Sequence, residues 1–397
     1  MENSPKKLPS LDEYLKEAEG PCLNKTVSPD GKYVKFKYTD HCTYSMGWNE
    51  VTLHARGHVF RLSDGKCVLR PWDKFFNYGE LFGQDGKPTQ LYKLLDDTPD
   101  MRPERALQGP FTATEKFDGS LCIAGIVDGA LLCTSSGSFT AWQAEWASDW
   151  LERNNVDKCM REGMTYLFEI IADADLHPIR YAFEGCVLLG IIDNDTGIEL
   201  PYDELMDFGP PLHLPVTPRT FCVNLNDAMS YVRNLPKTQE GLVVTYPSGF
   251  KLKLKGPEFL KIQKVFHSLS EKSLLEAFDY HRGDFPADIR EVVPEEFKDL
   301  WAFMNNFKAD YEMNLCMCLG YRAYAIAHEY TPREVWDGAN RVFTGRSRLI
   351  GAATAAAKVK CIDDPFLHSI WKIVYDAMVK EWKDKKDNKD NKEVSNG

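Results

Sequence analysis

The sequence predicts an α+β protein in which a domain of antiparallel sheets is followed by a separate all-α region. Three observations carry this prediction. Short apolar runs separated by turn residues continue to about residue 262, Asp-Gly and Asp-Asn pairs suit tight hairpins, and the apolar period becomes helical beyond residue 265. We expect domains at 1–262 and 263–382, and a charged, disordered tail at 383–397.

The composition is that of a globular protein. The chain has 397 residues, of which 43% are apolar and 27% are charged, so a packed core is expected, with two or three domains at this length. Lys and Arg number 48 against 59 Asp and Glu, which gives a net charge of −11. This balance argues against a generally basic protein that coats nucleic acid.

Strand-like runs follow one another in the first domain, and several end in turn residues. The clearest runs are Leu121–Val127, Ala130–Thr134, Tyr166–Ile171, Cys186–Ile192 and Gly241–Tyr246. Asp128-Gly129 joins the first two runs. Both residue types tolerate positive φ, as a two-residue antiparallel hairpin requires.

Helix signals follow in the second domain. Ser268-Leu-Ser-Glu271 and Thr331-Pro-Arg-Glu334 read as capping boxes, and Asp364-Pro365 as a further helix start. Two apolar faces follow the helical period, made of Leu300, Met304, Phe307, Tyr311 and Leu315, and of Leu367, Ile370, Trp371, Val374 and Met378. We interpret both faces as core packing in preference to a ligand site.

The cysteines indicate a reducing compartment. There are eleven, an odd number, without the paired spacings of a disulfide framework or a zinc ribbon, so we expect mostly buried, reduced thiols in a cytoplasmic or nuclear protein. The N-terminal segment 1–9 lacks the apolar core of a signal peptide. The longest apolar run, Val187–Ile192, is too short to span a membrane.

A lysine at the end of one strand is the main candidate for chemistry. Lys116 lies in Thr-Glu-Lys-Phe-Asp-Gly-Ser, and a lysine amine is a nucleophile only when nearby cations or desolvation lower its pKa. Lys251, Lys253 and Lys255 alternate along a later strand and therefore share one face. Residues 245–264 contain five lysines and one acid, a local charge of +4 that suits a phosphate-bearing ligand. The competing interpretation is a solvated or edge-protecting strand face.

Two carboxylates stand beside apolar strand residues. Glu169 lies in Tyr-Leu-Phe-Glu-Ile-Ile, and Glu240 precedes Gly-Leu-Val-Val. An uncompensated carboxylate in such a place is costly, so each is expected to bind a donor or a cation.

The order of these motifs resembles the covalent nucleotidyltransferase superfamily of ligases and capping enzymes. Lys116-x-Asp118-Gly119-Ser, Phe-Glu169, Glu240-Gly and Lys253-x-Lys255 follow one another as in that superfamily. Upstream, the Arg56-Gly strand and the segment Arg70-Pro-Trp-Asp-Lys74-Phe-Phe76-Asn are similar to the phage-type RNA ligase 1 family. The resemblance covers roughly residues 33–262. It implies a nucleotidyltransferase domain with an ATP-grasp-like ligase core, followed by a helical RNA-specificity domain.

The resemblance also implies a role for each matching residue. Lys116 would attack the α-phosphate of ATP to form lysyl-AMP, and Asp118 and Gly119 would shape its turn. Glu169 would bind the ribose, Glu240 would place Mg²⁺ or Mn²⁺, and Asp118 would act with the metal in later RNA joining. Lys253 and Lys255 would contact phosphates with help from Arg56 and Lys74, and Phe76 would pack near the nucleotide. The pair Lys253 and Lys255 is preferred to Lys251 because Gly-Pro-Glu-Phe259 follows it, as in the family.

Two positions depart from the family pattern. Ser136 stands where the family usually has a basic residue just before Gly-Ser. The family's Asn-Arg pair after the Phe-Glu motif has no clean match, and His177 or Arg180 is a candidate substitute.

The implied function is an ATP-dependent RNA ligase that joins 5′-phosphate and 3′-hydroxyl ends through lysyl-AMP and AppRNA intermediates. Its substrate would be a nicked or broken structured RNA such as a tRNA, in RNA repair. No Gly-x-x-x-x-Gly-Lys-Ser/Thr motif occurs, so a separate end-healing kinase or phosphatase is expected.

The alternatives are a DNA ligase, a capping enzyme, and a catalytically inactive relative that binds RNA. Basic residues of the second domain are candidates for RNA phosphate contacts or for a solvated helix face: Arg341, Arg346, Arg348, Lys358 and Lys360.

Overall fold

The structure is a computed structural model that divides into two compact units, Met1–Gln263 and Lys264–Gly397. It describes residues 6–83, 85–96, 103, 107, 109–175, 177–268, 274–276, 278, 298–342, 354, 371, 372, 375, 376, 379, 380 and 382. Each unit is considered by itself.

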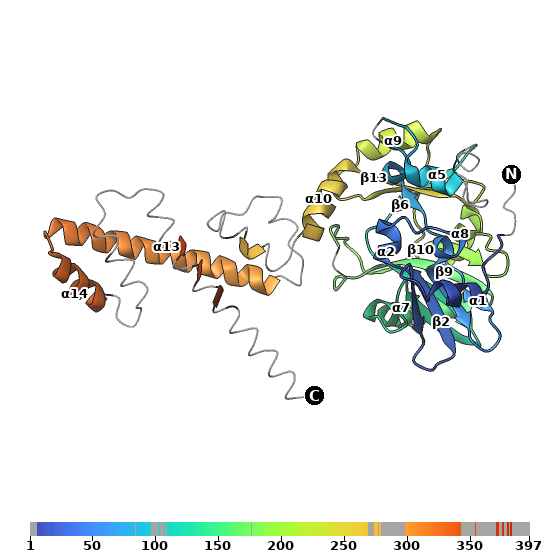
Figure 1. Ribbon diagram of the computed structural model, residues 1–397, viewed down its shortest axis with the longest axis horizontal. Coiled ribbons are helices and arrows are strands. Elements are labelled where there is room, and N and C mark those ends of the chain that lie inside the picture. The colour runs from blue at the N-terminus through green and yellow to red at the C-terminus, as the bar shows by residue number, and fades with distance from the viewer. Residues whose placement is uncertain are drawn as a thin grey trace. The chain divides into compact units, whose positions relative to one another are not determined.

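Three sheets organise the described part of the first unit (Figure 1). One contains β1 (Leu23–Val27), β2 (Tyr33–Tyr38), β3 (Arg56–Arg61) and β4 (Cys67–Leu69), in that order. The second has the order β10 (Gly185–Asp193), β9 (Met164–Ile171), β7 (Ser120–Val127), β8 (Ala130–Ser135). The third has the order β11 (Arg219–Thr220), β6 (Thr112–Lys116), β12 (Gly241–Thr245), β13 (Lys251–Lys255), β5 (Phe76–Asn77). All neighbours pair antiparallel except β13 and β5, which are parallel.

The predicted strands are confirmed, and the hairpin shows why. Asp128 and Gly129 connect β7 to β8 with φ of 53° and 78°. Positive φ at both central residues matches the right-handed twist of the two strands. The first unit is thus an α+β structure with antiparallel sheets, as predicted.

The sequence did not predict the helices that precede, connect and follow these strands. They are α1 (Leu11–Glu17), α2 (Asp40–Tyr44), α3 (Glu50–His54), α4 (Tyr78–Leu81), α5 (Gln90–Asp96), α7 (Trp142–Arg153), α8 (Tyr202–Phe208), α9 (Leu225–Arg233) and α10 (Pro257–Ser268), with short 3₁₀ turns at Asp157–Cys159 and Pro210–Leu212. Most of them have seven residues or fewer, too few for an apolar period to stand out. The last helix, α10, extends across residue 262, where we had expected a domain boundary.

The five-stranded sheet has one core face and one polar face. Leu242 and Val244 of β12 and Leu252 and Leu254 of β13 pack into a buried cluster with α5 and α9, which lie near this sheet in Figure 1. The opposite face carries three rows of paired residues: Lys116, Gly241 and Lys255; then Thr114, Val243 and Lys253; then Thr112, Thr245 and Lys251. Residues directly opposite in antiparallel strands project to the same side. The alternating lysines therefore project from the same face of the sheet as Lys116.

The described part of the second unit contains α13 (Lys298–Ala327) and α14 (Pro332–Val342). Thr331 caps α14, because its backbone N–H donates to Glu334 at 2.8 Å and its hydroxyl accepts from the Glu334 N–H at 3.4 Å, which confirms this capping box. Leu300 and Met304 are buried as predicted for their apolar face. Of the basic residues proposed for RNA contact only Arg341 is described. Ser268 is the last residue of α10, and the rest of its predicted capping box lies outside the described residues. The start at Asp364-Pro365, most of the second apolar face and the tail from 383 also lie outside them.

Two further expectations concern the burial of the cysteine thiols and the absence of a membrane-spanning segment. The nine cysteines whose side chains are described are free, and four of these nine, Cys42, Cys122, Cys133 and Cys186, are buried. The burial predicted for most of the eleven thiols stays a prediction. None of the helices in the described ranges is long and apolar enough to cross a membrane.

Candidate active site

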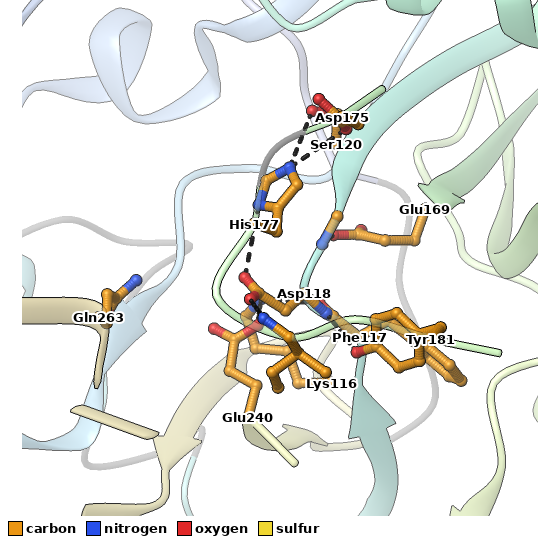
Figure 2. Close-up of polar contacts among 12 residues, drawn as sticks. Lys116, Phe117, Asp118, Ser120, Glu169, Asp175, His177, Tyr181, Glu240 and Gln263 are labelled. Atoms are coloured by element: carbon orange, nitrogen blue, oxygen red, sulfur yellow. Dashed lines mark hydrogen bonds and ion pairs between the residues drawn. The ribbon is translucent and has the colours of Figure 1, made fainter. Parts of the chain in front are cut away.

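Lys116, at the end of β6, is held by a buried carboxylate. Its ammonium donates to Oε2 of Glu240 at 2.8 Å, and Oε1 of the same carboxylate pairs with Nζ of Lys255 at 3.0 Å (Figure 2). Strand register explains this arrangement, since Gly241 lies between Lys116 and Lys255 across the sheet. Glu240 is only 2% exposed, so two lysines from different strands compensate its charge.

The protonation of Lys116 differs from the sequence-based expectation. Burial acts to lower the pKa of this lysine, but the carboxylates of Glu240, Glu169 and Asp118 outweigh it, and the pKa is raised above its usual value. The amine is therefore a cation in this structure. It becomes a nucleophile only when the Glu240 charge is offset or withdrawn.

Two cations on the cavity side share one aromatic ring. The guanidinium of Arg56 lies 4.8 Å from the centroid of Phe75, and Nζ of Lys253 lies 4.5 Å from it. Burial and the charges of Arg56, Lys74 and Lys116 hold the pKa of Lys253 well below its usual range. Nη1 of Arg56 is buried and finds no hydrogen-bond partner in the described part of the chain. Such crowded, incompletely paired cations suit an anionic ligand.

Glu169 projects from β9 toward the same cavity. Its Oε1 accepts a hydrogen bond from the backbone N–H of Gly119 at 3.0 Å. Burial raises the pKa of Glu169 to about 7, although Lys116 opposes the shift. A Cβ on Gly119 would lie 2.3 Å from the Ile170 carbonyl oxygen and 2.9 Å from Cγ of Glu169. Only glycine allows residues 116–119, the lysine turn, to approach β9 this closely.

These groups line a cavity of about 180 Å³. Its walls are Arg56, Trp72, Phe75, Thr114, Glu115, Lys116, Phe117, Gly119, Leu121, Glu169, Leu189, Thr217, Val243 and Lys253. Four predicted site residues and Gly119 therefore meet at one cavity, whose lining combines cations, carboxylates and apolar side chains. The remaining predicted residues, Asp118, Glu240, Lys255, Lys74 and Phe76, are not part of its lining.

Asp118 is tied to the loop that follows β9. One of its oxygens accepts from the Ile179 N–H at 3.0 Å, and the other lies 3.5 Å from Nδ1 of His177. Nε2 of His177 is 3.1 Å from Asp175, which places the ring between two carboxylates (Figure 2). Burial opposes the shift, but hydrogen bonds to Asp118 and Asp175 raise the pKa of His177 to about 10. Of the two candidate substitutes, the structure brings His177 to the lysine turn. Arg180 is exposed and donates to the Asp173 carbonyl.

Lys74 is surrounded by three aromatic rings, one of which is Phe76. The Lys74 ammonium lies 5.0, 5.3 and 4.9 Å from the rings of Tyr38, Trp48 and Phe76. Phe76 is only 1% exposed, so its ring packs on Lys74 instead of lining the cavity. Lys251 lies apart from Lys116 and pairs with Glu199 at 2.7 Å.

Sequence reasoning missed several groups that the fold brings here. Phe75 and Trp72 line the cavity, and the hydroxyl of Tyr181 accepts from the Asp118 N–H at 2.9 Å. Phe75 and Trp72 stand in the segment used for the resemblance, where their aromatic character was a usable signal. Ser136 stands where the family usually has a basic residue, but Lys37 of β2 lies next to this segment. Its Nζ would be 3.6 Å from a Cβ built on Gly137.

The carboxylates near Lys116 can be tested for their fit to a divalent metal ion. In the part of the chain that the structure describes, no group of three or more His, Cys, Asp or Glu side chains is arranged to hold an ion. Mg²⁺ often takes only one or two protein carboxylates and completes its shell with substrate phosphates and water. Glu240 fits that pattern, since its two oxygens pair with the mobile ammonium groups of Lys116 and Lys255. Asp118 fits it less well, because backbone and imidazole groups engage both of its oxygens.

Two comparisons of the sequence with known proteins find RNA ligases. Residues 54–259 match a family model described as RNA ligase. A protein of Thermovibrio ammonificans named "Putative RNA ligase" is 25% identical over 291 residues, which cover 69% of this chain and 70% of that protein.

Solved structures show weaker likeness. An archaeal ATP-dependent RNA ligase (form 2) is 15% identical, with 87% of this chain and 76% of that chain covered and a TM-score of 0.45. A Naegleria gruberi RNA ligase with PPi is 20% identical, with 39% of this chain covered and a TM-score of 0.34. The match spans about half (51%) of the Naegleria chain's length.

Proposed function

The chain belongs to the RNA ligase family, and we propose that it is an ATP-dependent ligase that joins 5′-phosphate and 3′-hydroxyl RNA ends. The single observation that supports this proposal best is that Lys116, Arg56, Lys253 and Glu169, from four different strands, line one cavity. A nucleophilic amine, two phosphate-binding cations and a carboxylate for sugar hydroxyls are the groups that nucleotidyl transfer requires.

In the proposed first step, the amine of Lys116 attacks the α-phosphorus of ATP. An N–P bond forms, the bond between the α-phosphorus and its bridging oxygen breaks, pyrophosphate leaves, and the amine loses a proton. Arg56 and Lys253 stabilise charge on the phosphates, and Glu169 accepts hydrogen bonds from the ribose hydroxyls. A divalent cation bound with Glu240 would offset the carboxylate charge that now raises the pKa of Lys116.

In the later steps, AMP passes from Lys116 to the 5′-phosphate of RNA, and the 3′-hydroxyl then displaces AMP to form the phosphodiester. Lys255 and Asp118 lie beside Lys116 and are proposed to act in these steps. By family resemblance the substrate is a broken structured RNA such as a tRNA, and a separate kinase or phosphatase prepares its ends.

Labelling with α-³²P-ATP and Mg²⁺ tests the first step. The protein should acquire a label that survives denaturation, is lost in acid and is stable in alkali, as a phosphoramidate is. Lys116→Ala should abolish it, whereas Lys261→Ala should not, because Lys261 is exposed and pairs only with Glu258 on the helix surface. An unlabelled wild-type protein that still binds RNA would be a catalytically inactive relative, and our proposal would be wrong.

Ligation assays then test the substrate. Single-stranded RNA, nicked duplex RNA and broken tRNA, each with 5′-phosphate and 3′-hydroxyl ends, are compared with DNA of the same design. Joining of DNA at the rate of RNA would favour the DNA ligase alternative.

A further inference from the structure

A second, larger cavity lies next to the one that contains Lys116. Its volume is about 440 Å³, and four residues line both cavities: Trp72, Thr114, Leu189 and Val243. These shared residues are therefore the boundary between the two spaces. None of the roles assigned above uses the second cavity.

The register of the five-stranded sheet gives the direction from one cavity to the other. Along β6, Lys116 and Thr114 line the first cavity, and Thr114 and Thr112 line the second. Residues two apart on a strand are separated by roughly 6.6 Å and project to the same side. The second cavity thus begins where the first one ends, on the side of Val243 that is away from Lys116.

The charges of the lining residues indicate whether the phosphates or the base of a nucleotide would face this boundary. Lys116, which the α-phosphate must reach, lies one row beyond the boundary on β6. Lys253 pairs with Val243 of the boundary row, but its ammonium lies over Phe75 together with Arg56. The boundary itself is formed by an indole, two aliphatic side chains and a threonine. A purine placed between Val243 on the sheet and Leu189 and Trp72 on the opposite wall buries its apolar faces. Its edge opposite the sugar, which carries C2 and N6, then points toward the second cavity.

The second cavity has the chemistry to accept an apolar group. Aromatic and aliphatic side chains dominate its lining, which includes Phe111, Leu200, Tyr202, Leu205 and Tyr246. Its charged pair, Lys251 and Glu199, is already satisfied at 2.7 Å. A cavity of roughly 150 Å³ is enough for a benzene ring, so the space also suffices in volume.

We propose that this cavity is a subsite for apolar substituents on C2 or N6 of the adenine, so that the protein uses base-extended ATP as an adenylyl donor. The inference rests on the proposed function. Selectivity for the nucleotide would then come from the phosphate and ribose contacts more than from the outer edge of the base.

The test compares α-³²P-labelled nucleotides as donors to Lys116 in the full-length protein. The probes are ATP and ATP carrying a benzyl group on N6, on C2 through sulfur, or on C8 through an amino group. We expect kcat/KM for the N6 or the C2 analogue within about tenfold of that for ATP, and a loss of about a hundredfold or more for the C8 analogue, whose substituent lies beside the sugar. If ATP labels the protein but both N6 and C2 analogues fail, the inference is wrong and the proposed function stands. If ATP itself gives no label, the proposed function fails.

Filling the cavity locates the substituent. Thr112 lines only the second cavity, and Thr112→Phe should leave ATP use within about twofold while reducing use of the accepted analogue by about tenfold or more. Thr112→Val, which keeps the side-chain shape, is the matched control, and Thr112→Leu replaces the Phe variant if that protein does not fold. Equal use of the analogue by the filled variant and the wild type would show that the substituent lies elsewhere and would overturn the subsite.

Discussion

At the scale of single residues, the shared carboxylate of Glu240 controls the charge state of its neighbours. It bridges Lys116 and Lys255, and its removal leaves only the charges of Glu169 and Asp118 to oppose burial, which lowers the pKa of Lys116. The first prediction follows from this balance.

Glu240→Gln should lower the pKa of Lys116 by about one to three units. The measurement is the pH dependence of Lys116 acylation by an amine-reactive reagent, followed by mass spectrometry of the peptide. The midpoint, not the amplitude, reports the pKa. Glu258→Gln removes an exposed pair and is the control, for which the midpoint should not move. An unchanged midpoint in Glu240→Gln would show that the ion pair does not hold the proton.

His177 contributes stability that depends on pH. Its pKa is about 10 in the folded chain and about 6.5 in an unfolded chain, so the folded state binds more protons between these values. The contribution is therefore fully present below pH 6.5 and is lost as pH rises toward 10. His177→Ala should reduce the free energy of unfolding by about 1 to 3 kcal/mol at pH 6 and by clearly less at pH 10.

Urea denaturation of the wild type, His177→Ala and the exposed-site control His41→Ala at both pH values measures this difference. Titrating groups that do not contact His177 contribute almost equally to the wild type and to His177→Ala, and His41→Ala shows the effect of removing an exposed histidine. A constant difference between wild type and His177→Ala across the range would contradict an imidazolium held between Asp118 and Asp175.

At the scale of elements, the close pairing of β12 with its neighbours sets the spacing of the charged groups. Gly241 has φ of 154°, and a Cβ there would lie 1.9 Å from the carbonyl oxygen of Leu254. No side chain fits without separating the strands. Glu240, the adjacent residue, is placed by this contact.

Gly241→Ala should therefore destabilise the protein by about 2 kcal/mol or more and reduce Lys116 labelling at temperatures where the variant is still folded. Thermal denaturation and labelling are measured together. Gly256→Ala is the matched control just beyond the end of β13 at which Gly241 pairs with Lys255, because its Cβ would meet its nearest neighbour at an ordinary 3.5 Å. Wild-type labelling by a folded Gly241→Ala would show that the pairing does not position the site.

The elements also show what the sequence could and could not predict. The β7–β8 hairpin follows from Asp128-Gly129, since local backbone preference alone specifies it. Helix α1 carries a capping box, in which the Ser10 N–H donates to Glu13 at 2.7 Å, yet it has seven residues and was overlooked beside the stronger strand pattern. The twelve-residue α7 begins at Trp142 without a side-chain cap, so no start signal marked it.

At the scale of the whole molecule, motifs far apart in the chain converge because three sheets bring them together. Their order predicted which residues meet, as Lys116, Glu169 and Lys253 do at one cavity. It did not predict their pairing. That Glu240 neutralises two lysines, or that Phe76 lies under Lys74, depends on register and packing, which no local pattern encodes.

The proposed nucleotide site lies within the first unit, Met1–Gln263. A fragment of residues 1–268, which keeps all of α10, should retain ATP-dependent labelling of Lys116 but lose discrimination between broken tRNA and single-stranded RNA. Labelling and ligation of the fragment are compared with the full chain, and its Lys116→Ala variant gives the background. A fragment that folds by circular dichroism but takes no label would show that the second unit is needed for the first step.

The ion pair between Lys116 and Glu240 has a consequence for the resting protein. A deprotonated lysine exposed to a cell's aldehydes and activated acyl compounds would be consumed by them in irreversible side reactions. Because Glu240 keeps the amine protonated, only a small fraction of it can react with such compounds at neutral pH, so these reactions are slowed before the first nucleotide binds.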